Sequence, residues 1–167
     1  MVGGGCVLFS EIRAAGRFDS DMEIKRVSPD ETKQLLDSEE GYVYIDVRTV
    51  AEFEAGHVPG AKNIPVLDRD SYGRMAPNER FAEIVEKNFG KTVKCIVGCQ
   101  KGARSMQAAA QLLNAGLSNV LDMRGGYGGE SDAMGRMSYP GWAPRGLPTT
   151  TESPPEDKFE HLLKQVD

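Results

Sequence analysis

The sequence is short of three things: cysteine, positive charge and long apolar runs. It has three cysteines in 167 residues, without the even number and regular spacing of a disulfide framework, which favours a reducing compartment. No stretch reaches the roughly 18 consecutive apolar residues of a transmembrane helix. The formal net charge of -5 also lacks the basic excess of a nucleic-acid-binding face. We therefore expect a cytoplasmic protein with neither a membrane nor a nucleic acid as partner.

Metal ligands and a targeting signal are lacking as well. The two histidines, His57 and His161, and the scattered cysteines do not have the spacing of a zinc site. The first sixteen residues have no charged segment ahead of their short apolar run, and acidic residues follow soon after. That pattern makes a poor signal peptide. We expect no bound metal and no leader segment at this end.

The length and composition are those of one globular domain with extensions at both ends. Hydrophobic residues make up 40% and charged residues 27% of the chain, which is ordinary for a domain with a packed core. Residues 1–21 show no clear period, residues 22–148 carry the pattern of the domain, and residues 149–167 are linker-like with room for a short helix. Because neither extension shows core periodicity, we expect residues 22–147 to fold without them.

Within the domain, apolar segments of two periods alternate. The sequence predicts strands over residues 23–27, 42–47, 61–66, 92–98 and 119–123. It predicts a helix capped by Ser28, with Pro29 and Glu31 behind the cap, and a helix over 49–57 closed by Gly56. It also predicts a helix capped by Asn78 and one from Gly102 to Gly116. Residues 68–77 are expected as a loop and residues 124–137 as a glycine-rich turn into a helix, and no internal repeat is evident. Strands alternating with helices indicate an α/β domain, a parallel sheet covered on both faces.

One thiol stands at a position suited to chemistry. Cys99 follows a predicted strand and precedes a predicted helix, the place where open α/β sheets bind ligands. Unpaired N–H groups at a helix start favour the thiolate over the thiol, and Lys101 and Arg104 add positive charge for a small anion. The alternative is a packing thiol with two solvated surface cations beside it. Gly98 and Gly102 favour a backbone cradle, because a packed strand needs neither.

The other cysteines suit structural roles. Four residues along a strand span roughly 13 Å, beyond the ~7 Å that a disulfide bridges, so Cys95 and Cys99 are not expected to pair. Cys95 points inward with the core of its strand and is expected to be structural. Cys6 lies in the N-terminal extension.

Three segments together resemble the single-domain rhodaneses, which are persulfide-forming sulfurtransferases. They are "YIDVRTVAEFEAGHVPGAKNIP" (44–65), "IVGCQKGARSMQAAAQLLNAG" (96–116) and "VLDMRGGYGG" (120–129). The resemblance implies a rhodanese-like five-stranded parallel sheet with helices on both faces, and no cofactor. It also implies that Cys99 takes a sulfane sulfur from a small anionic donor such as thiosulfate. The persulfide would then pass that sulfur to cyanide or to a thiol, small or on a protein.

The resemblance also assigns the residues around Cys99. It implies that the loop that follows, whose backbone amides would surround the persulfide, binds the substrate. That loop consists of Gln100, Lys101, Gly102, Ala103, Arg104 and Ser105. Asp46 and Arg48 match the family's Asp-Val-Arg, with bracing of the loop as their expected role and contact with substrate left open. His57 is expected to hold a turn rather than act as a base.

Two other function classes remain open at this stage. Cysteine phosphatases and arsenate reductases of related fold use Cys-x5-Arg, whereas Cys99 and Arg104 form Cys-x4-Arg, a shorter ring that suits a sulfur atom and crowds a phosphate. A non-catalytic rhodanese-like module for sulfur carriage or sensing is the other class, although such modules commonly lack the cysteine. The sequence also departs from the family, because Tyr127 stands where a tryptophan often follows the final Gly-Gly. The single tryptophan of the chain is Trp142.

Overall fold

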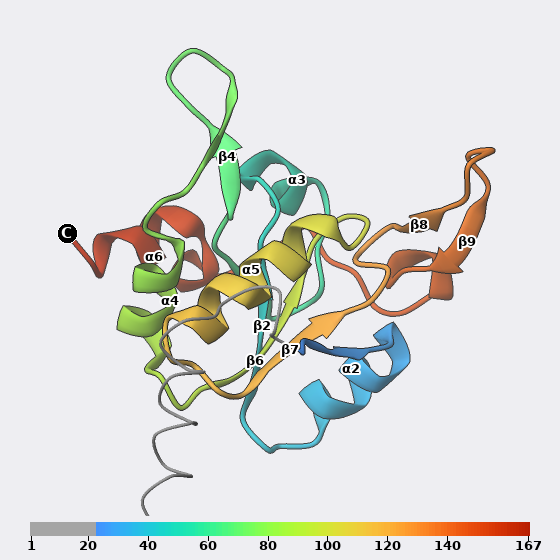
Figure 1. Ribbon diagram of the computed structural model, residues 1–167, viewed down its shortest axis with the longest axis horizontal. Helices are drawn as coiled ribbons and strands as arrows, with labels where there is room; N and C mark the ends of the chain where they lie inside the picture. The colour runs from blue at the N-terminus through green and yellow to red at the C-terminus, as the bar shows by residue number, and fades with distance from the viewer. Residues whose placement is uncertain (1–22) are drawn as a thin grey trace, which may run out of the picture.

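The computed structural model describes residues 23–167 and is built on a five-stranded parallel sheet. The strands stand in the order β1-β7-β6-β2-β3 (Figure 1). They are β1 (Lys25–Val27), β2 (Tyr42–Asp46), β3 (Lys62–Asn63), β6 (Lys94–Gly98) and β7 (Val120–Met123). All four pairings are parallel. The α/β class and the parallel sheet predicted from the sequence are confirmed.

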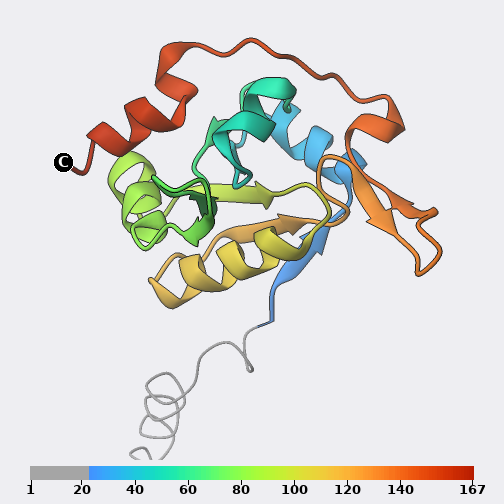
Figure 2. The ribbon, with the colours of Figure 1, turned by 90° about the horizontal axis from the view of Figure 1, so that it is seen from above.

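Helices cover both faces of this sheet. Figure 2 shows α2 (Pro29–Asp37) and α3 (Val50–Ala55) on one side, with α4 (Phe81–Phe89) and α5 (Ala103–Asn114) on the other. Alternate residues of each strand enter opposite layers of core. Thus Ile45 packs in the cluster that includes α4 and α5, and its neighbour Tyr44 packs in the cluster that includes α3.

Two of the helix starts show why the chain turns helical there. The Ser28 hydroxyl accepts from the Glu31 N–H while the Glu31 carboxylate accepts from the Ser28 N–H, and Thr49 and Glu52 repeat this exchange at the start of α3. Each exchange satisfies two otherwise unpaired donors. The prediction that Asn78 caps α4 is wrong. Its side-chain oxygen accepts from the Arg80 N–H at 3.1 Å, which closes a turn just before the helix.

Two hairpins replace the irregular segments expected from the sequence. Strands β4 (Leu67–Arg69) and β5 (Met75–Pro77) pair antiparallel where a loop is predicted. Strands β8 (Gly129–Ser131) and β9 (Met137–Pro140) also pair antiparallel, so the predicted helix after the glycine-rich turn is wrong. Both hairpins project from the domain, the first at the top of Figure 1 and the second at its right.

The two hairpins share one turn, a short internal repeat that sequence analysis missed. Residues 70–75 read Asp-Ser-Tyr-Gly-Arg-Met and residues 132–137 read Asp-Ala-Met-Gly-Arg-Met. In each, the opening aspartate accepts hydrogen bonds from the backbone N–H groups two and four residues later. The distances are 2.8 and 3.0 Å at Asp70 and 2.9 Å for both bonds at Asp132. The repeat therefore encodes a tight turn with its own side-chain acceptor.

The C-terminal segment packs on the domain, unlike the linker-like extension expected from the sequence. Thr150 exchanges backbone hydrogen bonds with His57, and α6 (Phe159–Lys164) lies beside α4 (Figure 1). Leu162 is 3% exposed in the larger core cluster. These contacts reach partners some 70 to 95 positions earlier in the chain, so periodicity within six residues does not reveal them.

Cys6 and the expectations for residues 1–21 lie outside the described residues. Within residues 23–167, no helix combines the length and the apolar character that crossing a membrane requires.

Candidate active site

Cys99 lies between the carboxyl end of β6 and the amino end of α5, as predicted. Strand β6 ends at Gly98, and α5 begins at Ala103. The Cys99 sulfur accepts a hydrogen bond from the Gly102 N–H at 3.0 Å and lies 3.4 Å from the Ser105 hydroxyl oxygen. A backbone donor and a helix start therefore face one sulfur atom, an arrangement that favours negative charge there.

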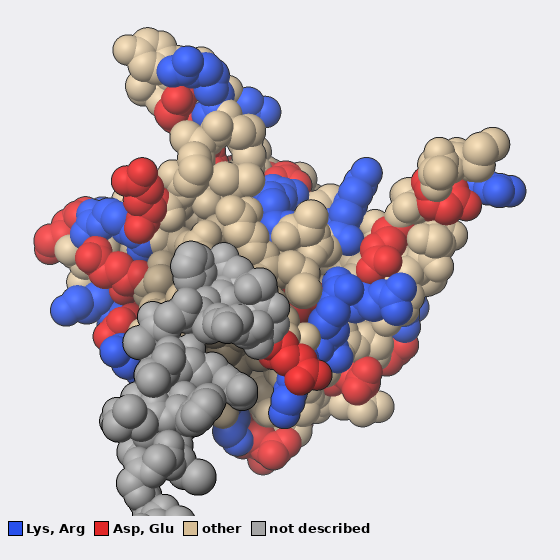
Figure 3. Space-filling view, viewed as in Figure 1, with Lys and Arg blue, Asp and Glu red and all other residues tan. Residues whose placement is uncertain are grey.

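A small pocket opens over this sulfur. Its volume is about 240 Å³, and it is lined by Cys99, Gln100, Lys101, Ala103 and Arg104. Cys99 itself is only 1% exposed. A molecule that reacts with its sulfur therefore has to enter the pocket that the loop residues line. Space-filling in Figure 3 shows Lys and Arg interspersed with Asp and Glu over the visible face. On this face, no large patch of a single charge sign is seen.

The two cations of the loop differ in their partners. Arg104 forms a two-pronged ion pair with Glu52 of α3, at 2.7 and 2.9 Å. The hydrogen bond from Arg104 is the largest influence on Glu52 and lowers its pKa to about 2. Lys101 is exposed and has no ion pair among residues 23–167. Lys101 therefore supplies the uncompensated positive charge at the pocket, whereas much of the Arg104 charge is neutralised.

Asp46 and Arg48 form a buried hydrogen-bonded pair that contacts the cysteine loop. The buried Arg48 guanidinium holds the Asp46 carboxylate at 2.7 Å and donates to the carbonyl oxygen of Gly56 at the same distance. Its remaining nitrogen donates to the Gln100 side-chain oxygen at 3.1 Å, and the ring of Tyr127 lies 4.4 Å away. The side-chain oxygen of Gln100 is thus engaged by Arg48. This geometry fits bracing by Asp46 and Arg48.

The glycine-rich segment after β7 holds the backbone of the cysteine loop. Tyr127 N–H donates to the Cys99 carbonyl at 2.7 Å, and Gly128 N–H donates to the Gln100 carbonyl at 2.9 Å. A Cβ atom on Gly126 would lie 2.3 Å from the Cys99 carbonyl oxygen. Only glycine permits so close an approach.

Glycine is required at position 98 for a different reason from the backbone cradle inferred from the sequence. A Cβ atom there would lie 1.8 Å from the Tyr44 hydroxyl, so this glycine makes room for a neighbouring strand's aromatic side chain. Gly102 has φ +116°, in the region that favours glycine. The cradle therefore depends on Gly102, and Gly98 serves packing.

His57 holds the chain rather than facing the thiol. It is 1% exposed, stacks on Phe53 at 3.7 Å, and its two ring nitrogens lie 2.7 and 3.1 Å from the carbonyl oxygens of Phe53 and Glu152. Trp142 is likewise buried, and its ring N–H donates to the Pro148 carbonyl at 2.6 Å. His57 thus contacts the C-terminal segment through Glu152, and Trp142 holds the chain just before that segment.

Cys95 is suited to packing alone. It is fully buried in the core, and burial raises the pKa of its thiol to about 12. Both Cys95 and Cys99 are free thiols. Cys95 therefore stays protonated and unreactive near neutral pH.

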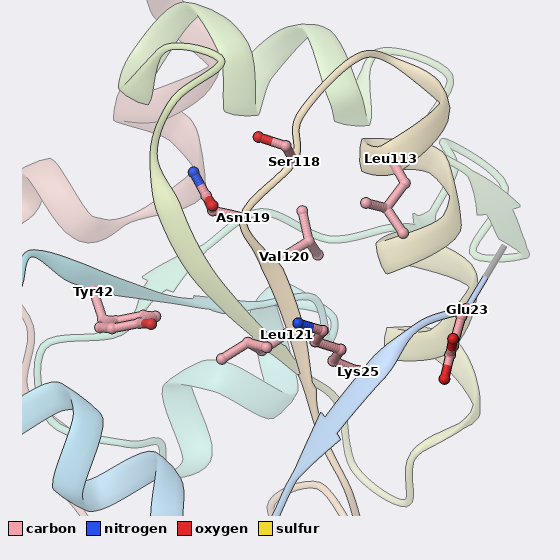
Figure 4. A pocket seen from close by; sticks show the side chains of 8 residues that line it. All are labelled: Glu23, Lys25, Tyr42, Leu113, Ser118, Asn119, Val120 and Leu121. Atoms are coloured by element: carbon pink, nitrogen blue, oxygen red, sulfur yellow. The ribbon is translucent and has the colours of Figure 1, made fainter. Parts of the chain in front are cut away.

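A second pocket, of about 220 Å³, lies at the other end of the sheet (Figure 4). Tyr42 and Val120, the first residues of β2 and β7, line it together with Lys25 and Leu113. No cysteine or histidine lines this pocket. A free thiol and a helix start meet at the Cys99 end.

The family follows from comparison with known proteins. A model of the rhodanese-like domain matches residues 28–130. The chain belongs to the rhodanese-like family. The resemblance that the three sequence segments indicated is confirmed, and the matched region includes β2, the Cys99 loop and the glycine-rich segment after β7.

Relatives of this rhodanese-like chain include named sulfurtransferases. Thiosulfate sulfurtransferase 16, chloroplastic, of Arabidopsis thaliana is 43% identical over 109 residues, 65% of this chain and 80% of that protein. Thiosulfate sulfurtransferase 18 of the same plant is 40% identical over 107 residues, 63% and 76% of the two chains. The chain is thus a member of a sulfurtransferase family. Because the first relative is named as chloroplastic, the cytoplasmic location expected from the sequence stays a prediction.

A solved structure supports the fold. The crystal structure of Rv0390 from M. tuberculosis superposes with a TM-score of 0.65 at 23% identity, over 78% of this chain and all of that one. At this identity the likeness concerns the rhodanese-like fold alone.

Proposed function

We propose that this protein transfers a sulfane sulfur from a small anionic donor such as thiosulfate, through a persulfide on Cys99, to cyanide or a thiol. The contact between the Gly102 N–H and the Cys99 sulfur carries the proposal. The N–H dipole points at the Cys99 sulfur. That sulfur is negatively charged when it attacks the donor and again when it leaves as a thiolate at the end of the cycle. The names of the two plant relatives support thiosulfate as the donor.

The reaction divides into two displacements. The Cys99 thiolate attacks the outer sulfur of thiosulfate, so the new S–S bond forms as the bond to the sulfite sulfur breaks and sulfite leaves with that electron pair. Cyanide or an acceptor thiolate then attacks the outer sulfur of the persulfide, and Cys99 leaves as a thiolate. Lys101 attracts the donor anion, and the donors at the start of α5 stabilise the anionic sulfur. No metal or organic cofactor takes part in this scheme.

Two observations disfavour the phosphatase or arsenate reductase alternative. The loop has Cys-x4-Arg spacing, and the Arg104 guanidinium is held at 2.7 Å by Glu52. An arginine bound in this way lacks the freedom to encircle a tetrahedral oxyanion. The presence of Cys99 under an open pocket favours catalysis over a purely non-catalytic module.

Steady-state turnover of thiosulfate and cyanide tests the proposal. Cys99→Ser should abolish thiocyanate formation, because a hydroxyl at this position forms no persulfide. Cys95→Ser is the matched control, since it makes the same change at the other buried cysteine of the described chain and should keep most of the activity. Wild-type turnover in Cys99→Ser would overturn the assignment.

A further inference from the structure

Arg26, on the edge strand β1, reaches the active-site loop from outside the pocket. It lies opposite Asp122 of β7 in the parallel sheet, and its Nε donates to the Asp122 carboxylate at 2.9 Å. The Arg26 side chain is 36% exposed, whereas that of Asp122 is 0% exposed. Arg26 is not among the residues that line the pocket over Cys99. Arg26 therefore bears on the loop rather than on a bound donor.

The guanidinium group of Arg26 lies against Gly102. A Cβ atom on Gly102 would lie 3.4 Å from Arg26 Nη2 and 3.8 Å from the Gly125 amide nitrogen. Apart from the chain neighbours of Gly102, no other heavy atom of residues 23–167 comes within 4 Å of that position. Arg26 thus supplies the side chain that packs on this flank of Gly102, the residue whose N–H donates to the Cys99 sulfur.

Asp122 fixes the direction of this guanidinium. Burying a carboxylate is unfavourable unless a donor compensates it, so the bond to Arg26 is costly to break. The guanidinium is planar and presents its donors in a rigid fork. With Nε bound to Asp122, Nη2 is held facing Gly102. A lysine has one ammonium group at the end of a flexible chain, and that group cannot occupy both places at once.

We propose that Arg26 is a positioning residue for the reaction at Cys99. Anchored on Asp122, it keeps Gly102 at φ +116°, the conformation in which the Gly102 N–H points at the sulfur. That N–H stabilises the thiolate, so loss of the Arg26 contact lets the loop relax and leaves the thiolate less stable. The inference deepens the proposed sulfur transfer and rests on it, because that reaction requires Cys99 as the nucleophile. Arg26 should therefore affect kcat rather than KM for thiosulfate.

Alkylation of Cys99 by iodoacetamide tests the proposal without a sulfur donor, so its outcome is separate from that of the proposed function. The rate is followed near neutral pH by mass spectrometry of the peptide that contains Cys99. Arg26→Lys keeps a positive charge beside Asp122 but gives up the contact with Gly102. We expect alkylation about tenfold slower than in the wild type, the effect of losing one hydrogen bond to a charged group. Urea unfolding should remain close to that of the wild type, which excludes a loss of folding as the cause.

Two further variants provide the comparison. Arg145→Lys makes the same change at another arginine that pairs with an aspartate, Asp30 at 2.7 Å, and should be alkylated at the wild-type rate. In a Gly102→Ala background, Arg26→Lys should slow alkylation no further, because the contact through which Arg26 acts is already lost. Alkylation of Arg26→Lys at the wild-type rate would overturn the proposal. Slowing of the same size in Arg145→Lys, or on top of Gly102→Ala, would overturn it as well.

Discussion

The amide nitrogen of Gly102 lies 3.0 Å from the sulfur of Cys99, three residues back along the chain. This contact requires Gly102 to adopt φ +116°, which turns the loop back toward the sulfur just before α5 begins. The conformation of the loop and the hydrogen bond to the sulfur thus depend on the same residue.

Gly102→Ala should damage both properties. A side chain at positive φ is strained by about 1–2 kcal/mol, and its Cβ atom would meet the Arg26 guanidinium at 3.4 Å. We expect a lower free energy of unfolding by about that amount and a larger loss of sulfur transfer, because the loop moves away from the sulfur. Urea unfolding together with turnover measures the two effects. Gly60→Ala, also at positive φ but in open space, is the control and should lose stability while keeping activity.

Lys101→Ala should weaken capture of the anionic donor. Lys101 lines the pocket and has no ion pair within residues 23–167, so its loss removes positive charge without leaving a buried partner. If it binds the ground and transition states alike, KM for thiosulfate rises about two- to tenfold while kcat changes little. Lys87→Ala, an exposed lysine on α4, should leave KM unchanged. An unaltered KM for thiosulfate in Lys101→Ala would contradict a role of Lys101 in binding the donor.

The ion pair between Glu52 and Arg104 should stabilise the protein in a pH-dependent manner. Arg104 lowers the pKa of Glu52 to about 2, against about 4.3 for an exposed glutamate. The stabilisation is therefore fully present above roughly pH 5 and lost as pH falls through about 2. Because the pair is partly exposed, Glu52→Gln should lower the free energy of unfolding by about 1 kcal/mol at pH 7. The difference should vanish in strong acid.

Glu54→Gln is the control for this pH dependence. It makes the same change at an exposed position of α3, where no ion pair occurs among the described residues. Urea unfolding at several pH values should separate the wild-type and Glu52→Gln curves but not the wild-type and Glu54→Gln curves. Parallel curves for Glu52→Gln across this pH range would show that the ion pair contributes nothing to stability.

Leu162→Ala should destabilise the whole domain. The sequence indicated that residues 149–167 are dispensable, yet Leu162 is 3% exposed in the larger core cluster. Removing a leucine side chain from such a site lowers the free energy of unfolding by about 2–4 kcal/mol. Leu163→Ala, half-buried in the same helix, should have a smaller effect. Equal, small changes in thermal unfolding would mean that α6 contributes little to the core.

Local sequence signals predicted the elements that depend on local contacts. The capping exchange at Ser28 and the apolar run of β6 are complete within a few residues, so both were predictable. The position of Cys99 followed from the order of strand and helix. The hairpin at residues 129–140 was missed because glycines in a turn are compatible with several continuations, and the pattern shared with residues 70–75 went unnoticed.

Partners distant in sequence were not predictable. No residue near Arg104 in the sequence indicates that Glu52, 52 positions earlier, forms an ion pair with it. The need for glycine at position 98 was equally unpredictable, because it comes from Tyr44 on a neighbouring strand. These relationships arise from tertiary packing, which one chain's periodicity does not encode.

Intact-mass measurement of the protein after thiosulfate treatment tests the central claim most directly. We predict that the wild-type protein and Cys95→Ser each gain one sulfur atom, that cyanide removes it with release of thiocyanate, and that Cys99→Ser gains none. A wild-type mass that thiosulfate leaves unchanged, or an equal gain of sulfur by Cys99→Ser, would contradict a persulfide carried on Cys99.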